Sequence, residues 1–149
     1  LKLPSGKGTW PAFWMMPHNY TSWPADGEID IMEEVGYDPT HVQSSIHCTN
    51  YYGGNSKNGR YTLNTAQSQF HVYACEWTPD YLKFYVDGTL IFTYTNDGSG
   101  KNTWPFNAPF YLKLNNAFGG NWGGAQGVDY SCLPNIYEID YVRVFQKKI

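Results

Sequence analysis

Short runs of apolar residues, separated by turn residues, recur along the whole chain. The runs are rich in Tyr, Phe, Val, Ile and Thr, which favour the pleated, half-buried surface of a β-strand. We expect strands at residues 9–16, 28–35, 42–49, 70–78, 81–86, 89–95, 110–115 and 137–146. No segment keeps a helical apolar period over three turns. Short strands without helical crossovers predict an all-β fold, an antiparallel β-sandwich or jelly roll.

The clearest local signal is the segment LKFYVDGTLIFTY, whose Asp87-Gly88 pair can supply two residues of positive φ. A two-residue loop of this kind predicts an antiparallel hairpin between its flanking strands. The polar, glycine-rich stretch 50–59 is expected to form one long surface loop. We find no internal repeat, linker or low-complexity segment, so residues 1–149 are interpreted as a single domain.

The segment DGEIDIMEEVG places several carboxylates inside an otherwise apolar strand. Side chains alternate across a strand, so Glu28 and Asp30 share one face while the isoleucines point to the core. Glu33 breaks this alternation and would face the core, where an unpaired carboxylate is costly. One extra residue in a β-bulge near Met32 would bring Glu33 onto the face of Glu28 and Asp30. The spacing is therefore intelligible if three acids look into one cleft.

Three like charges on one strand face repel each other, so folding gains nothing from them, but chemistry can use them. Two carboxylates about 5 to 5.5 Å apart equip a retaining glycosidase, in which one attacks the anomeric carbon and the other protonates the departing oxygen. Repulsion from Glu28 and Asp30 would raise the pKa of Glu33 and keep it an acid near neutrality. Spacing alone also allows a solvated acidic strand. A calcium site is a third possibility, although the D-x-D-x-D-G loop spacing is missing.

The composition adds an aromatic surface to this picture. Aromatic residues make up 18% of the 149 residues and charged residues only 15%, which suggests a ring-lined face beyond the needs of a core. The net charge is −3 and no basic stripe exists, so we expect no nucleic-acid partner. The longest nearly apolar run, WPAFWMMP, is far shorter than the ~20 residues that cross a bilayer, so we expect no membrane span. Cys48, Cys75 and Cys132 lack zinc-site spacing and are interpreted as buried thiols.

A series of motifs in this order, WPAFWMMP, WPADGEIDIMEEVG, SSIHCTN, EWTPDYLKFYVDG, GGNWGG and YEIDYVRVFQ, resembles the laminarinase-like branch of glycoside hydrolase family sixteen. The resemblance covers essentially the whole chain, and EIDIME is highly specific to the family. It implies a concanavalin A-like β-jelly roll of two curved sheets and retaining endo-hydrolysis of β-1,3 or mixed β-1,3-1,4 glucans or related galactans. It also implies that Glu28 is the nucleophile, Asp30 the assisting acid and Glu33 the acid/base.

The same resemblance indicates substrate-binding residues. It places Trp14 and Trp23 around the cleaved sugar, and Trp122 with Asn116 along the cleft; an indole offers an apolar face to a pyranose. Core packing is the alternative for each tryptophan, and Trp10 is assigned to the core. His47, on the strand after the acids, is expected to hydrogen-bond Glu33 or the substrate, with simple packing as the alternative.

The resemblance implies no cofactor for catalysis, but it places a structural Ca²⁺ at Asp140, whose other ligands would have to come from outside this chain. Family domains usually carry more strands before LKLP, so we expect a sandwich without those N-terminal strands, corresponding to the C-terminal two thirds of a family-type catalytic domain. We expect a secreted monomer whose partner is a polysaccharide. The alternatives are a galactan hydrolase and a non-catalytic, lectin-like β-glucan-binding module, for which opposed acids would have no use.

Overall fold

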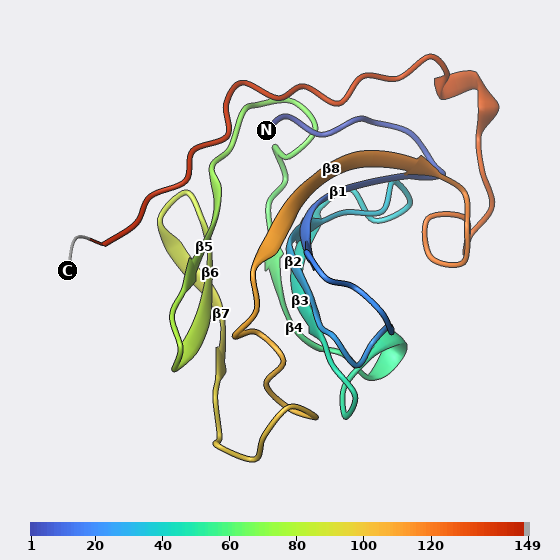
Figure 1. The fold of residues 1–149 in the computed structure, drawn as a ribbon. Coiled ribbons are helices and arrows are strands. Elements are labelled where there is room, and N and C mark those ends of the chain that lie inside the picture. The colour runs from blue at the N-terminus through green and yellow to red at the C-terminus, as the bar shows by residue number, and fades with distance from the viewer. Residues whose placement is uncertain (148–149) are drawn as a thin grey trace.

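The computed structural model describes residues 1–147 and folds their strands into two antiparallel sheets (Figure 1). The strands are β1 Thr9–Pro17, β2 Glu28–Glu33, β3 His41–His47, β4 Lys57–Thr62, β5 Tyr73–Trp77, β6 Tyr81–Val86, β7 Thr89–Thr95 and β8 Phe110–Phe118. Two short 3₁₀ helices, η1 Gly53–Asn55 and η2 Tyr130–Cys132, are the helical elements of this range. Within it, a helix of the length and apolarity needed to cross a membrane does not occur.

The larger sheet has the strand order β4-β3-β2-β1-β8, and the smaller one the order β5-β6-β7. The smaller sheet lies against the convex face of the larger, strongly curved sheet (Figure 1). Between them the core is continuous: Ile29 and Ile46 of the larger sheet and Leu82 and Phe84 of the smaller one are fully buried. The predicted all-β antiparallel sandwich is confirmed.

The β6–β7 hairpin forms at the predicted turn. Asp87 has φ of 48° and Gly88 has φ of 80°, the left-handed backbone that a tight two-residue loop requires. The Asp87 carboxylate also accepts a 2.8 Å hydrogen bond from the Val72 amide and lies 2.6 Å from Nδ1 of His71. The turn is therefore tied to the segment that leads into β5.

One strand occurs where the sequence predicts a loop. β4, Lys57–Thr62, begins inside the stretch 50–59 and pairs antiparallel with β3. Its sequence KNGRYT offers little apolar pattern because it is an edge strand of the sheet, exposed over much of its length. Backbone pairing with β3, which no local pattern reveals, makes it a strand.

The strand predicted at 137–146 is wrong. This segment is extended, but its backbone pairs only through the bridge between Lys2 and Glu138. Among residues 1–147 no other strand runs beside it, so its amides lack the ladder partners that define a strand. Ile139 and Tyr141, which alternation would bury, remain 47% and 45% exposed.

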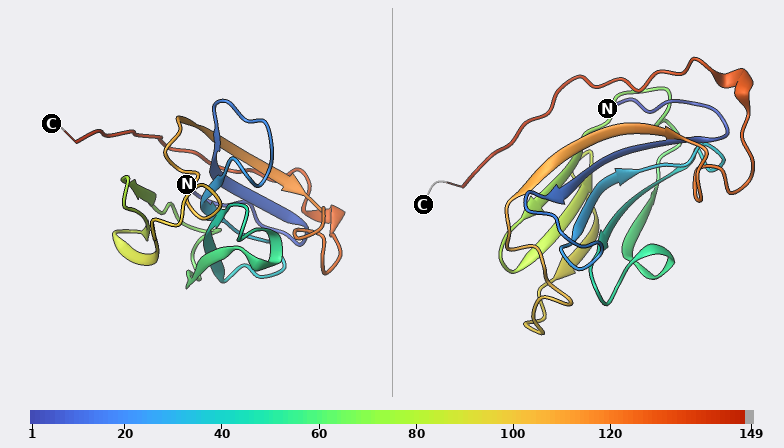
Figure 2. Two further views of the ribbon diagram at one scale, coloured as in Figure 1. Left: turned by 60° about the horizontal axis from the view of Figure 1, so that its bottom comes forward. Right: turned by 45° about the vertical axis from the view of Figure 1, so that its right-hand side comes forward.

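The concave face of the larger sheet points away from the smaller sheet (Figure 2). Alternation along β1 places Trp10, Ala12 and Trp14 on this face, while Met15 enters the core. The curvature gathers side chains from β1, β2 and β8 around one hollow, which holds the candidate site.

Candidate active site

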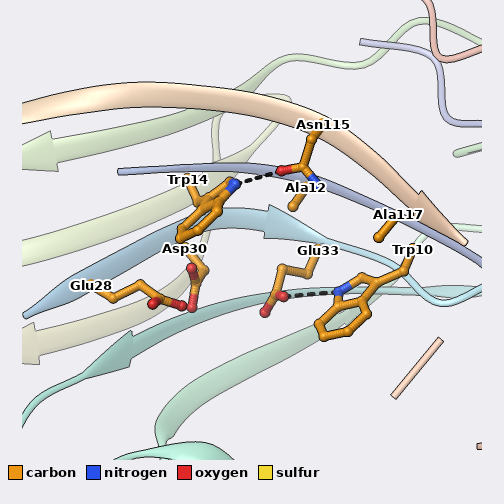
Figure 3. Close-up of a pocket in the computed structure, with 8 residues that line it drawn as sticks. All are labelled: Trp10, Ala12, Trp14, Glu28, Asp30, Glu33, Asn115 and Ala117. Carbon is orange, nitrogen blue, oxygen red and sulfur yellow. Dashed lines mark hydrogen bonds between the residues drawn. The ribbon is translucent and has the colours of Figure 1, made fainter. Parts of the chain in front are cut away.

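A β-bulge in β2 brings the three acids onto one face. Asp30 pairs with Trp14 of β1 and Met32 pairs with Phe13, which leaves Ile31 without a partner on β1. Ile31 and Met32 are both turned into the core, with 5% and 1% of their surface exposed. The bulge predicted near Met32 is confirmed, and it returns Glu33 to the face of Asp30 (Figure 3).

The acids line a pocket on the concave face. Its lining comes from three adjacent strands and consists of Trp10, Ala12, Trp14, Glu28, Asp30, Glu33, Asn115 and Ala117 (Figure 3). The cavity volume is about 210 Å³, below the ~300–1,000 Å³ of pockets that enclose most of a ligand. This size suits a site that holds one part of a longer substrate.

Glu33 is half-buried in the wall of the pocket, and its pKa lies near neutrality. Burial, with a smaller contribution from the charge of Glu28, raises the pKa of Glu33 to about 7, and the hydrogen bond from Trp10 opposes this rise. That bond joins Trp10 Nε1 to Glu33 Oε1 at 3.1 Å. Glu33 can therefore hold a proton in slightly acidic solution and release it in slightly alkaline solution.

Asp30 is the most deeply buried of the three acids, with 2% of its surface exposed. Burial, followed by the charges of Glu33 and Glu28, raises the pKa of Asp30 well above its ordinary value. Its Oδ2 has no hydrogen-bond partner in residues 1–147. A protonated Asp30 can use its hydroxyl as a donor to the neighbouring Glu28 carboxylate, which keeps that carboxylate in place.

Glu28 is held by an indole N–H. Trp23 Nε1 donates a 2.7 Å hydrogen bond to Glu28 Oε2, although the Trp23 side chain is 41% exposed. The Trp23 ring also packs edge-on against Tyr52, with ring centroids 5.8 Å apart, and lies 5.7 Å from the ring of His47. Trp23 therefore fixes one carboxylate oxygen of Glu28 and still exposes an apolar surface to solvent.

His47 lies beside Glu28 and Asp30. Its Nε2 is 3.8 Å from Glu28 Oε1 and 3.1 Å from Asp30 Oδ2, without the alignment of a hydrogen bond. Burial lowers the pKa of His47, more than the charge of Glu28 raises it, so the ring is neutral at pH 7. From the sequence we expect His47 to hydrogen-bond Glu33 or the substrate. The structure instead places its ring beside Glu28 and Asp30.

Glu28, Asp30 and His47 also have the composition of a metal site, with ligand atoms within 4.8 Å of one another. The Gly53 amide, however, donates a 3.1 Å hydrogen bond to His47 Nδ1. A neutral ring that accepts at Nδ1 carries its proton on Nε2, the atom that faces the carboxylates. A metal ligand needs that lone pair and normally donates through its other nitrogen. This tautomer therefore argues against a metal site at Glu28, Asp30 and His47.

Trp14 is positioned by two residues of β8. Its Nε1 donates a 2.7 Å hydrogen bond to Asn115 Oδ1, and the Lys113 ammonium lies 4.2 Å from its ring centre. Asn115 lines the pocket. The predicted Asn116 does not: alternation along β8 turns it to the other face, where its amide donates to Asn135 Oδ1 at 2.6 Å.

Trp122 lies one ring away from the pocket. It packs edge-on against Trp10, with ring centroids 5.6 Å apart, and Trp10 itself lines the pocket and donates a hydrogen bond to Glu33. The sequence interpretation of Trp10 as a core residue is wrong. The sequence does indicate that Trp10 lies at the site. Trp10 and Trp14 are four residues apart on one strand, so their side chains must share a face.

Asp140 lies in the extended segment after η2 and is exposed. In residues 1–147, Glu28, Asp30 and His47 form the one group of three acidic, His or Cys side chains close enough to hold an ion, and Asp140 is not in it. Calcium takes six to eight oxygen ligands. The described residues around Asp140 do not provide such a set.

Comparisons with known proteins agree with this geometry. A family model described as Glycosyl hydrolases family 16 matches residues 1–143. The chain is 44% identical to a β-glucanase of Rhodothermus marinus over 156 residues, which cover 97% of this chain and 54% of that protein. It is 40% identical to a keratan-sulfate endo-1,4-β-galactosidase of Sphingobacterium multivorum over 151 residues, 97% of this chain and 35% of that protein.

A solved structure gives the same result. The fold matches the laminarinase of Rhodothermus marinus with a TM-score of 0.86 and 43% identity, over 90% of this chain and 58% of that one. The chain spans about half the length of this laminarinase and of the β-glucanase from the same organism. The match along nearly the whole chain confirms the resemblance seen in the sequence, and the chain belongs to glycosyl hydrolase family 16.

Proposed function

We propose that this chain carries the catalytic site of a retaining endo-hydrolase of β-glucans that cleaves β-1,3 or mixed β-1,3-1,4 linkages. One observation carries the proposal: Glu28, Asp30 and Glu33 line a single pocket, and the pKa of Glu33 is about 7. A carboxyl group that can hold a proton near neutrality, with a second carboxyl group beside it at one sugar site, is the equipment of a double displacement.

In the first step a Glu28 oxygen attacks the anomeric carbon of the bound sugar. The glycosidic bond breaks, and its oxygen takes the proton of Glu33 and leaves as an alcohol. The sugar is then joined to Glu28 as an ester, and Glu33 is ionised. Formation of the ester removes the negative charge of Glu28, one of the contributions that raise the pKa of Glu33.

In the second step Glu33 acts as a base. It takes a proton from a water molecule whose oxygen attacks the anomeric carbon, and the bond to Glu28 breaks with its electrons returning to the carboxylate. Two displacements at one carbon restore its original β configuration. The Asp30 hydroxyl and the Trp23 N–H would hold the Glu28 carboxylate for both steps.

The substrate class rests on the relatives and on the shape of the site. The names of two relatives are β-glucanase and laminarinase, and both cover this chain almost completely. The small pocket on the concave face of the curved sheet would hold the part of a long glucan chain at which the bond is cut. The relative named keratan-sulfate endo-1,4-β-galactosidase makes a galactan the second candidate substrate.

The test is product analysis with the intact protein on laminarin, lichenan and agarose, with proton NMR of the first-formed reducing ends. We expect laminarin to be cut to oligosaccharides whose new reducing ends are β. First-formed α ends would contradict retention, and hydrolysis of agarose alone would move the substrate class to galactans. Binding of laminarin without cleavage of any of the three would favour the non-catalytic, lectin-like alternative.

We also propose that the protein acts outside the cytoplasm, because a polymeric glucan does not cross a membrane. We further propose that it is a monomer. Cell fractionation and light scattering test these two points. A structural Ca²⁺ at Asp140 would take its remaining oxygen ligands from outside the described residues. A calcium-dependent rise in melting temperature that Asp140→Asn abolishes would support this site, and an equal rise in both proteins would contradict it.

A further inference from the structure

The loop between β1 and β2 contains a carboxylate that the proposed reaction does not use. Asp26 is two residues before Glu28, and its side chain is 13% exposed. Its Oδ2 accepts hydrogen bonds from the Thr21 amide at 2.9 Å, the Thr21 hydroxyl at 2.7 Å and the Ser22 amide at 2.8 Å. The Asp26 amide in turn donates to the Ser22 carbonyl at 2.9 Å. These bonds close residues 21–26 into a compact ring.

A second loop is attached to the same carboxylate. Lys101, in the connection between β7 and β8, lies with its ammonium 2.8 Å from Asp26 Oδ1. Lys101, followed by the Thr21 and Ser22 donors, lowers the pKa of Asp26 far below its ordinary range, so the group is charged at neutral pH. Oδ2 of Asp26 therefore binds donors within residues 21–26, and Oδ1 binds the second loop through Lys101.

Trp23 is part of this ring. Its main chain lies between Ser22, which Asp26 binds, and Asp26 itself, while its indole N–H reaches Glu28 Oε2 at 2.7 Å. Because Trp23 is 41% exposed, packing alone holds its ring only in part, through Tyr52 and His47. The path of the loop backbone must therefore determine where the indole N–H lies relative to the carboxylate.

We propose that Asp26 is a positioning residue: with Lys101 it holds the 21–26 loop so that Trp23 orients the Glu28 carboxylate for attack. The proposal rests on the proposed function, because it assigns Glu28 as the attacking group. It adds that the orientation of Glu28 is set from outside the pocket, by a carboxylate that touches neither the substrate nor the reacting atoms.

The first experiment compares Asp26→Ala with the parent in laminarin hydrolysis. We expect kcat to fall by about tenfold or more, because a small displacement of a reacting group has effects of this size or larger, and KM to change less. Asp26→Asn keeps an oxygen acceptor for the loop amides and should recover part of the loss. Lys101→Met removes only the bond between the two loops and should also cause a partial loss of kcat. This variant tests the proposal if Asp26→Ala does not fold.

A double-mutant cycle separates positioning from general destabilisation. In a Trp23→Phe background the indole N–H is already absent, so Asp26→Ala should cause little further loss of kcat. An equal loss in both backgrounds would overturn the proposal. The matched control is Asp129→Ala: Asp129 Oδ1 accepts from the Ser131 amide at 2.9 Å and the Ser131 hydroxyl at 2.6 Å in a turn outside the pocket. This control should leave kcat unchanged.

A readout without substrate keeps the proposal distinct from the proposed function. In ¹H–¹⁵N NMR spectra the indole N–H of Trp23, assigned by its loss in Trp23→Phe, should move upfield in Asp26→Ala as its bond to Glu28 weakens. The other five indole signals should keep their positions. An unchanged Trp23 signal in Asp26→Ala would overturn the positioning role, even if the enzyme is active. A shifted signal in a protein that cleaves no glucan would support the positioning of Trp23 and contradict only the proposed function.

Discussion

The indole of Trp10 and the carboxyl group of Glu33 form a hydrogen bond of 3.1 Å between two adjacent strands of the larger sheet. The N–H donor stabilises the ionised form of Glu33, whereas burial stabilises the protonated form. The pKa of about 7 is the balance of these opposed effects. A residue on β1 therefore adjusts the acidity of the proposed proton donor on β2.

Trp10→Phe should shift the alkaline limb of the pH profile upward. The proposed acid must be protonated, so the parent should lose kcat/KM as pH rises through about 7. Removal of the N–H raises the pKa of Glu33, by about one unit for a hydrogen bond to a charged group. The limb should move to higher pH by that amount, as measured by kcat/KM on laminarin from pH 5 to about 9. A limb that moves down would contradict the assignment.

The control for this variant is Trp77→Phe. Trp77 also donates its indole N–H, to the Phe106 carbonyl at 2.9 Å, but it does not line the pocket. Its replacement should reduce stability somewhat and leave the position of the alkaline limb unchanged.

Glu28→Ala should abolish hydrolysis of laminarin and leave folding and glucan binding nearly intact. The substitution removes the atom that would form the ester but leaves the aromatic side chains around the pocket in place. Glu76→Ala is the matched control, since Glu76 is an exposed carboxylate on β5 that accepts from Tyr81 and Tyr85, away from the site. Reducing-sugar release and isothermal titration calorimetry measure the two properties. Comparable turnover in Glu28→Ala would reject it as the nucleophile.

Asn115→Ala and Asn116→Ala should differ although the residues are neighbours. Asn115 accepts from the Trp14 indole in the pocket, so its loss should raise KM and lower kcat/KM by roughly tenfold, the effect of about 1.4 kcal/mol. Asn116 bonds Asn135 on the opposite face and should have kinetic constants close to those of the parent. Steady-state kinetics on laminarin decide between them, and a larger effect at Asn116 would contradict the register of β8.

Glu34→Gln should stabilise the protein in alkaline solution. Glu34 is 1% exposed, and its Oε2 has no hydrogen-bond partner in residues 1–147. Burial raises the pKa of Glu34 from 4.5 to about 8, against the hydrogen bond from Gln67. The folded protein therefore binds more protons than the unfolded chain between these values, and the parent loses stability as pH rises through this window, by up to about 1.4 kcal/mol per unit.

The neutral glutamine removes this pH dependence. Urea denaturation should find the variant close to the parent at pH 5 and more stable than the parent at pH 8. A variant that is less stable at pH 8 would show that Glu34 is ionised and paired in the folded protein.

Alternation along strands predicted much of the site. The positions of Glu28 and Asp30 relative to buried Ile29 follow from period two, and the misplaced Glu33 was enough to predict the bulge. The same rule, applied to β1, would also have placed Trp10 beside Trp14. That error came from a preference for large apolar residues in cores and not from a lack of signal.

Other features depend on pairing that one sequence does not encode locally. The register of β8 decides whether Asn115 or Asn116 faces the pocket, and a shift of one residue exchanges them. β4 is a strand because β3 lies beside it, and the segment 137–146 is not one because only Lys2 pairs with it. The Asp26 ring likewise depends on loop geometry that polar composition cannot specify.

The unpaired Ile31 also determines which separations are open to the two chemical groups. Along a regular strand, residues on one side are always an even number of positions apart, whereas Glu28 and Glu33 are five apart. An odd offset exists only because the additional backbone unit is absorbed on the hydrophobic side. Deleting Ile31 would restore a regular strand in which the two glutamates are an even number of positions apart. The proton donor would then stay on the pocket face, one residue closer to Glu28, so the reach of this site can change only in whole steps of the main chain.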